Sequence, residues 1–230
     1  MAYTTFTDSQ GTQITNYGYM NSIWNKLKSY GLSDESVAAL MGNLYAESLC
    51  VPYIVQSNLT PPFSYSINYT TDVNNGTISE YDFVHNGPNG GGYGLAQWTY
   101  KTRKQGLYDY WQNGSYSSIG DYVLACDYIW YELNNGFTDT LNYLKNNSKT
   151  LQQKVDYVLK HYESPADQSA SVSAQRYKYA HAILEYMQGT VVDPPDDGSG
   201  SGGGSGGGNA PPSTHKKIRF KVLRNPIYYT

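Results

Sequence analysis

Two short stretches of the sequence, LMGNLYAES at positions 40–48 and GGYGLAQWT at positions 91–99, decide how the chain is interpreted. In the first, apolar residues recur at helical spacing, and Glu47 stands near the end of this predicted helix, on the flank of its apolar stripe. The second stretch is glycine-rich and strand-like, and its glycines permit a close approach by a ligand. We therefore expect the Glu47 carboxyl to lie where a helix end meets a glycine-rich segment.

Helical periodicity extends over most of the remaining sequence up to position 189. It fails between about 52 and 98, where prolines, asparagines, glycines, threonines and tyrosines dominate, and this texture predicts an irregular β-rich insertion or hairpin. The predicted fold class is α+β, mainly helical with a small β-rich segment. Helices are expected from about Tyr17 to Leu27, from Ser33 through Glu47, and over 101–112, 118–134, 138–146, 150–162 and 170–188.

A change of composition at 190–213 marks the clearest boundary in the chain. The run DDGSGSGGGSGGGNAPPS cannot bury enough apolar surface to become ordered, so it predicts a flexible linker. Residues 1–189 then form one domain. Residues 214–230 form a basic tail in which Ile218, Phe220 and Val222 alternate with cationic residues, as in a strand. A lone strand of this length is not stable by itself, so the tail is expected to pair with a partner or with its own domain.

The composition excludes some classes of partner. Charged residues make up 15% of the 230 residues and the net charge is −3, which does not suggest binding to nucleic acid or to an anionic membrane surface. The first ten residues, MAYTTFTDSQ, lack the basic and apolar regions of a signal peptide. No apolar run is long enough to span a bilayer. We expect no nucleic-acid partner, no membrane partner and no signal peptide.

The cysteines and histidines do not predict a metal site or a cofactor. Cys50 and Cys126 could form one disulfide or remain as two free buried thiols, and the sequence leaves both alternatives open. No CxxC, HxxxH or HxH spacing occurs, so neither zinc nor another metal is expected. The four histidines are His85, His161, His181 and His215.

The segments that flank the two opening stretches extend the pattern. KTRKQGL follows the tryptophan at 101–107, and HYESPADQSASVSAQRYKYA at 161–180 contains a Glu-x-Pro turn before the last predicted helix. With the helix-borne Glu47 and the Gly-Leu-x-Gln run, these segments resemble the phage tail lysozyme family of the lysozyme-like superfamily. The resemblance covers most of 14–188. It implies a lysozyme-like fold and hydrolysis of the β-1,4 bond between N-acetylmuramic acid and N-acetylglucosamine in peptidoglycan.

The resemblance also implies roles for individual residues. Glu47 would be the general acid, which needs a raised pKa that partial burial can provide. Trp98 could stack on a sugar or fill the core, and core packing is the favoured interpretation, whereas Tyr93 is expected in the cleft. Arg176 is expected to tie the last helix to a carboxylate. The residues expected to contact substrate are Tyr93, Gly94, Leu95, Gln97 and Trp98.

The sequence does not decide which residue would be the second catalytic carboxylate. Asp72, Glu80 and Asp82 all lie in the predicted β-rich segment, where a base or nucleophile is expected. Asp82 is the leading candidate because the run from Asp82-Phe83 into the glycines resembles the family. A lytic transglycosylase, which uses a hydroxyl of the sugar itself as nucleophile, would not need a second acid.

The resemblance further implies that the protein belongs to the phage tail and acts on the bacterial cell wall. Its expected partners are peptidoglycan glycan strands and, through 214–230, other tail or virion proteins. Two other functions fit the same residues: a lytic transglycosylase of the same fold, and a structural tail component that binds glycan without cutting it.

Overall fold

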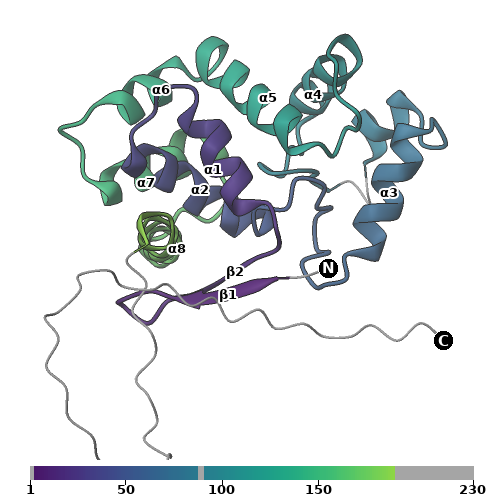
Figure 1. Ribbon diagram of the computed structural model, residues 1–230. Helices are drawn as coiled ribbons and strands as arrows, with labels where there is room; N and C mark the ends of the chain where they lie inside the picture. Colours follow the sequence, from purple (N-terminus) through teal and green to yellow (C-terminus); the bar gives the residue numbers. More distant parts are fainter. Residues whose placement is uncertain (1–2, 88–90, 190–230) are drawn as a thin grey trace, which may run out of the picture.

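One helix, α2 (Asp34–Ser48), lies at the centre of the fold in the computed structural model, which describes residues 3–87 and 91–189 (Figure 1). Every residue of α2 from Ser36 to Tyr45 is buried. Its N-terminus is capped by Ser33, whose Oγ accepts a hydrogen bond from the Ser36 backbone N–H at 3.3 Å. A helix that is buried on all sides must be covered all round by other elements.

The neighbours of α2 are α1 (Met20–Lys28), α7 (Leu151–Val158) and α8 (Ala170–Gln188). The closest approach is between α2 and α8 at Gly42, where an added Cβ would lie 2.6 Å from the Cβ of Ala180. Only glycine allows this contact. The two helices that carry Glu47 and Arg176 are therefore held tightly together.

The remaining helices lie around this centre. They are α3 (Ser64–Asn74), α4 (Lys101–Asn113), α5 (Tyr122–Asn135) and α6 (Thr138–Lys145), with two short π-helical turns, η1 (Asp82–Asn86) and η3 (Leu159–Glu163). The helix predicted over 150–162 is thus α7 followed directly by η3. The helix predicted from 118 begins at Tyr122, because the Asp121 side chain caps it by accepting from the Val123 N–H at 2.8 Å. The predicted helix over 170–188 agrees with α8.

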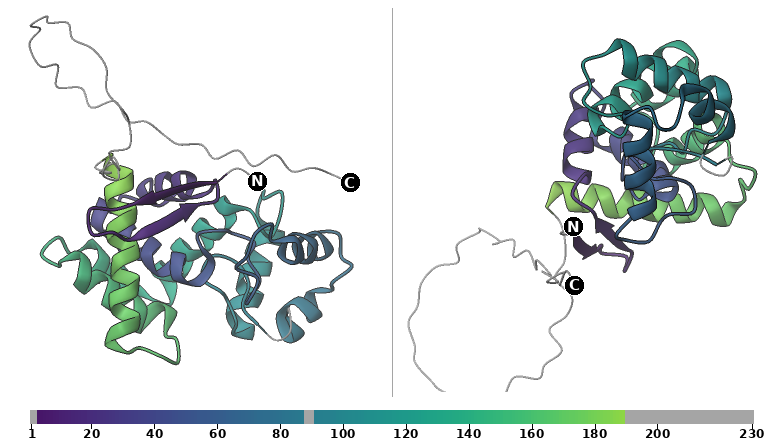
Figure 2. Two further views of the ribbon diagram at one scale, coloured as in Figure 1. Left: turned by 90° about the horizontal axis from the view of Figure 1, so that it is seen from below. Right: turned by 90° about the vertical axis from the view of Figure 1, so that its right-hand side faces the viewer.

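The sheet is an antiparallel pair at the N-terminus, β1 (Thr4–Thr7) and β2 (Gln13–Asn16), with Thr4 opposite Asn16. Figure 2 shows this hairpin beside α8. The fold class predicted from the sequence is confirmed: mainly helical, with a small β element.

The predicted position of the β structure is wrong. Within the described part of 52–98 the structure has α3, η1 and isolated bridges that join Tyr93 to Val55 and Trp98. The buried face of α3 consists of Ser66, Tyr69, Thr70 and Val73. These positions have helical spacing, but mostly polar residue types, so the periodicity of aliphatic residues did not reveal the helix.

Both cysteines are free and buried, which settles the alternative left open by the sequence. Among the described residues, no helix is both long and apolar enough to cross a membrane. The predicted linker at 190–213 and the predicted tail at 214–230 lie outside the described residues.

Candidate active site

Glu47 lies in the last turn of α2, and its side chain keeps 21% of its surface exposed. Its Oε1 accepts a hydrogen bond from Nη2 of Arg176 on α8 at 2.5 Å. The carboxyl is thus fixed in direction but still reachable from solvent. The prediction that Arg176 ties the last helix to a carboxylate is confirmed.

Arg176 is itself held by α2. Its Nη1 donates to the backbone oxygen and to Oδ1 of Asn43, at 3.2 and 3.3 Å. Asn43 is fully buried and donates in turn to the carbonyl oxygens of Ala39 and Val155. The Glu47–Arg176 ion pair therefore rests on a fully buried hydrogen-bonded support, which limits its freedom to reorient.

A second buried ion pair joins α4 and α5. The Glu132 carboxylate accepts from Nε and Nη2 of Arg103, at 2.6 and 2.8 Å. It also accepts from the Trp98 indole N–H at 3.0 Å and from the Tyr162 hydroxyl at 2.7 Å. Sequence reasoning did not identify Glu132, which lies between ordinary helix residues with no motif around it.

Glu163, the last residue of η3, interacts electrostatically with both ion pairs. Burial and the negative charge of Glu47 raise its pKa to about 8, with Arg103 and Arg176 acting in the opposite direction. Its Oε1 is buried and has no hydrogen-bond partner among the described residues. We call these five side chains the carboxyl–arginine cluster: Glu47, Arg103, Glu132, Glu163 and Arg176.

Charge balance adds to the reasons for the raised pKa of Glu163. The cluster has three carboxyls and two guanidinium groups, and each guanidinium is already paired, one with Glu47 and one with Glu132. A third carboxylate, with one oxygen buried, would have no counter-charge of its own, so the neutral form is favoured. Sequence reasoning noted the Glu-x-Pro turn that contains Glu163 but gave it no chemical role.

Residues with a left-handed backbone conformation lie close to Glu47 and Glu163 in the chain. Six non-glycine residues in the described chain have a positive φ, and two of them, Leu49 and Cys50, directly follow the end of α2. Ser164 directly follows Glu163, with a φ of 46°. Such conformations persist only where the surrounding structure enforces them, and they are common at functional sites.

The segment from Gly92 to Trp98 forms a tight loop against residues 54–56. Gly94 has a φ of +79°, and an added Cβ there would lie 2.8 Å from the Trp98 ring. The Gln97 amide nitrogen donates to the carbonyl oxygens of Ile54 and Gly94, both at 3.0 Å. Both amide hydrogens of Gln97 therefore hold the loop, and its side-chain oxygen remains as the group that can accept from a ligand.

Most of the predicted substrate-contacting residues belong to this loop but are buried in it. Gly94 and Leu95 are buried. Trp98 is also buried and donates to Glu132, in agreement with the core interpretation that we favoured. Tyr93 was expected in the cleft, and this is corrected: its side chain is fully buried against Tyr69 and Phe83, and its hydroxyl is bonded to Thr70. Only Gln97 keeps an exposed surface.

Asp82, the leading candidate for a second carboxylate, is the first residue of η1 and is exposed. It accepts from the Ser79 hydroxyl at 2.6 Å and the Asn86 amide at 2.7 Å, and these bonds lower its pKa. Among the described residues, no hydrogen bond or ion pair joins Asp82 to the carboxyl–arginine cluster. The charge of Glu47 instead raises the pKa of Glu163.

Two other features lie outside the cluster. Asp8, His181 and Glu185 come together although the sequence shows no metal-ligand spacing. Asp8 accepts from His181 Nδ1 at 2.9 Å and Glu185 accepts from the Ser9 N–H at 2.7 Å, so the group fastens the hairpin to α8.

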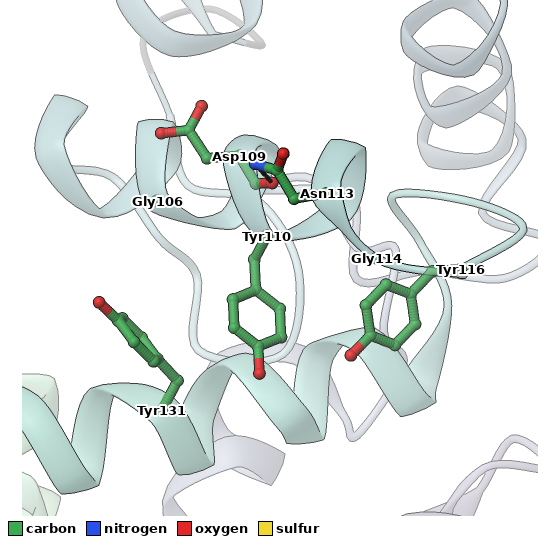
Figure 3. Close-up of a pocket in the computed structure, with 7 residues that line it drawn as sticks. All are labelled: Gly106, Asp109, Tyr110, Asn113, Gly114, Tyr116 and Tyr131. Carbon is green, nitrogen blue, oxygen red and sulfur yellow. Dashed lines mark hydrogen bonds between the residues drawn. The ribbon is translucent and has the colours of Figure 1, made fainter.

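The second feature is a hollow of about 420 Å³ between α4 and α5. Figure 3 shows Tyr110 between Tyr116 and Tyr131, with Asp109 and Asn113 pointing away from this row. Its single acid, Asp109, is exposed and bonded to Gln105. The hollow offers an aromatic surface with one exposed acid and does not include any residue of the carboxyl–arginine cluster.

Comparison with known families gave one match. A sequence model of phage tail lysozymes matches residues 19–187, a range that contains the whole carboxyl–arginine cluster and the loop from Gly92 to Trp98. Among curated proteins, none is significantly similar to the chain.

Proposed function

Because the chain belongs to the phage tail lysozyme family, and so to the phage-associated, lysozyme-like cell-wall hydrolases, we propose that it cleaves the glycan strand of peptidoglycan. The bond cleaved is the β-1,4 linkage between N-acetylmuramic acid and N-acetylglucosamine. Glu47 is the catalytic acid in this proposal, and it protonates the leaving sugar oxygen.

The observation that carries this proposal is the setting of Glu47. Its carboxyl is partly exposed at the end of a buried helix and is oriented by Arg176 at 2.5 Å. A general acid must reach the substrate oxygen and must be held in one geometry, and this arrangement supports both needs. Asp82, exposed and bonded to its own neighbours, has weaker support as the second carboxylate.

For sugar binding, the proposal centres on Gln97. It is the one residue among the predicted substrate contacts that combines exposed surface with a polar side chain. Its side-chain oxygen can accept from the N–H of an N-acetyl group, while its amide nitrogen holds the loop. Tyr93, Leu95 and Trp98 would then act by supporting the loop from the core.

In the phage, we propose that the protein is part of the tail and aids entry through the cell wall. Residues 214–230 would bind another virion protein, because their alternating basic and apolar residues suit the addition of a strand to a partner's sheet. Truncation after about residue 195 tests this proposal. Cleavage of sacculi should persist and incorporation into virions should fail; normal incorporation would remove the anchoring role.

Analysis of the digestion products separates this function from its two alternatives. Purified sacculi are incubated with the full chain, and the new glycan ends are identified. Reducing ends support hydrolysis, and 1,6-anhydro ends would show a lytic transglycosylase. Binding to sacculi with no new ends would show a structural tail component that recognises glycan without cutting it.

A further inference from the structure

Gln97, the residue proposed to bind the sugar, has an unusual backbone conformation. Its φ is 44°, in the left-handed region, which glycine adopts readily and other residues seldom adopt. Such a conformation persists only where the surrounding structure enforces it, and it is common at functional sites. The contacts on the two sides of Gln97 show what holds it.

On its N-terminal side, Gln97 is held by other loop residues. Its backbone N–H donates to the Gly94 carbonyl oxygen at 3.1 Å, which closes a turn over 94–97. Its side-chain nitrogen donates to the carbonyl oxygens of Ile54 and Gly94, both at 3.0 Å. These acceptors all lie in loops, so these bonds do not fix Gln97 to the helices.

On its C-terminal side, the next residue is anchored to a helix. The backbone N–H of Trp98 donates to the Tyr93 carbonyl oxygen at 2.9 Å, and the Trp98 carbonyl oxygen accepts from the Tyr93 N–H at 3.2 Å. The Trp98 indole Nε1 donates to Oε2 of Glu132 on α5 at 3.0 Å. The main chain and the side chain of Trp98 are both fixed, which restricts the peptide that joins it to Gln97.

Glu132 is itself held by two further elements. Its carboxylate is buried and accepts two hydrogen bonds from Arg103 on α4 and one from the Tyr162 hydroxyl of η3. The Arg103 guanidinium lies over the Tyr162 ring, 4.8 Å from its centroid. Charge-assisted bonds to a buried carboxylate are strong, so Glu132 is a well-fixed acceptor for Trp98.

We propose that Glu132 is a positioning residue for sugar binding: through Trp98 it enforces the left-handed conformation of Gln97, which leaves the Gln97 side-chain oxygen open to an N-acetyl group. This inference rests on the proposed role of Gln97 in sugar binding. Of the four bonds to Glu132, the one from Trp98 leads to the loop, and the other three hold the carboxylate.

Two donors to the same oxygen supply a matched pair of variants. Trp98→Phe removes the indole N–H and Tyr162→Phe removes the hydroxyl, and both side chains are buried. Each change takes one donor from a buried carboxylate, so both should lower stability. Only Trp98→Phe breaks the connection to Gln97, and Tyr162→Phe is therefore the control for a purely structural effect.

A double variant removes the acceptor itself. Glu132→Met combined with Arg103→Met deletes both charges of the ion pair, so that no unpaired charge stays buried. Trp98→Phe also removes ring volume, and its effect is therefore measured again in this double variant. An effect transmitted by Glu132 should be much smaller there, and an effect as large as in the wild type overturns the proposal. If the double variant does not fold, the comparison of Trp98→Phe with Tyr162→Phe decides.

The first measurement is the conformation of Gln97 in the full-length protein. The nuclear Overhauser effect between the amide and Hα hydrogens of one residue is strong at positive φ, because these two hydrogens are then closest. It should be strong for Gln97 in the wild type and in Tyr162→Phe. It should be weaker in Trp98→Phe and in the double variant. An equally strong signal in all four proteins overturns the proposal.

The second measurement is the affinity for N-acetylglucosamine, a probe that has no glycosidic bond to cleave. Binding is followed by NMR at the side-chain amide signals of Gln97. Trp98→Phe and the double variant should raise Kd by about threefold to tenfold, the equivalent of one hydrogen bond. Tyr162→Phe should keep the wild-type Kd. Equal weakening in Tyr162→Phe and Trp98→Phe would show a general loss of stability and overturns the positioning role.

The wild-type titration separates the failure of this inference from the failure of the proposed sugar contact. If the sugar shifts no Gln97 signal in the wild type, the contact at Gln97 fails, and Glu132 does not position it. If the wild type binds the sugar and Trp98→Phe binds it equally well, the contact stands and only the role of Glu132 is overturned.

Discussion

Replacing Glu163 with glutamine should make the protein more stable than the wild type in alkaline solution, even though the change lies beside the candidate catalytic acid. Glutamine has nearly the shape of a protonated glutamic acid and carries no charge. In the folded wild type, burial and the charge of Glu47 raise the pKa of Glu163 from 4.5 to about 8. The folded state therefore holds a proton that the unfolded state releases at lower pH.

The sign and size of the effect follow from this difference in pKa. Below about pH 4.5 the carboxyl is protonated in both states, and the stabilisation is fully present. As pH rises from there through about 8, the folded state keeps a proton that the unfolded state has lost, so the free energy of unfolding falls. At 1.36 kcal/mol per pH unit the upper limit of the loss is about 5 kcal/mol. Rearrangement around the charged group would reduce it to a few kcal/mol.

Urea unfolding followed by far-UV circular dichroism measures the effect. The free energies of unfolding of wild type and Glu163→Gln should be similar at about pH 5, and the variant should be the more stable by a few kcal/mol at about pH 9. Glu35 is an exposed glutamate in the first turn of α2, and the control Glu35→Gln should follow the wild type at both values. If the difference between wild type and Glu163→Gln changes by less than about 1 kcal/mol over this range, the pKa of Glu163 is not raised as described above.

Three further predictions concern parts of the fold that hold the site. Gly42→Ala should destabilise the protein by about 1–3 kcal/mol in urea unfolding, because the new Cβ would lie 2.6 Å from a side-chain carbon of α8. Gly136→Ala is its control, since the nearest atom there is 3.8 Å away, and equal effects would refute the packing argument. Asp8→Ala should cost about 1–3 kcal/mol because it leaves two backbone N–H groups and a histidine of α8 without their acceptor, and an unchanged urea midpoint would contradict this. The thiols of Cys50 and Cys126, whose pKa values are raised by burial, should react with a disulfide reagent only after unfolding; rapid reaction of the native protein would show that they are accessible.

The helices with aliphatic faces could be predicted from the sequence, and the β structure could not. The segment over 170–188 has clear start and stop signals and was predicted at its observed bounds. The helix α3 was missed because its buried face includes Ser66 and Thr70, which have no hydrophobic signal. The hairpin was missed because its strands are only four residues long each and are fastened by Asp8 to a helix more than 170 residues away.

In the candidate site, too, features set by neighbouring residues could be predicted, and features that depend on residues far apart in the sequence could not. Glu47 at a helix end and the tight loop that contains Gln97 are local features, and the sequence placed both. The pairing of Glu47 with Arg176 was anticipated only as a tie to an unnamed carboxylate. Glu163 lies 116 positions after Glu47, and what sets it apart is a buried carboxyl oxygen and the nearby charges that shift its pKa, which appear only once the chain is folded. A glutamate in a Glu-x-Pro turn was the one available signal, and it carries no information about burial.

The most direct test of the central claim is the rate at which new reducing ends appear when purified sacculi are incubated with wild type, Glu47→Gln and Glu35→Gln. Loss of a general acid lowers the rate by about 10² to 10⁴, so Glu47→Gln should fall by that factor while its far-UV spectrum stays close to that of the wild type. Glu35→Gln should keep the wild-type rate. A Glu47→Gln protein that releases reducing ends at close to the wild-type rate would contradict the assignment of Glu47 as the catalytic acid.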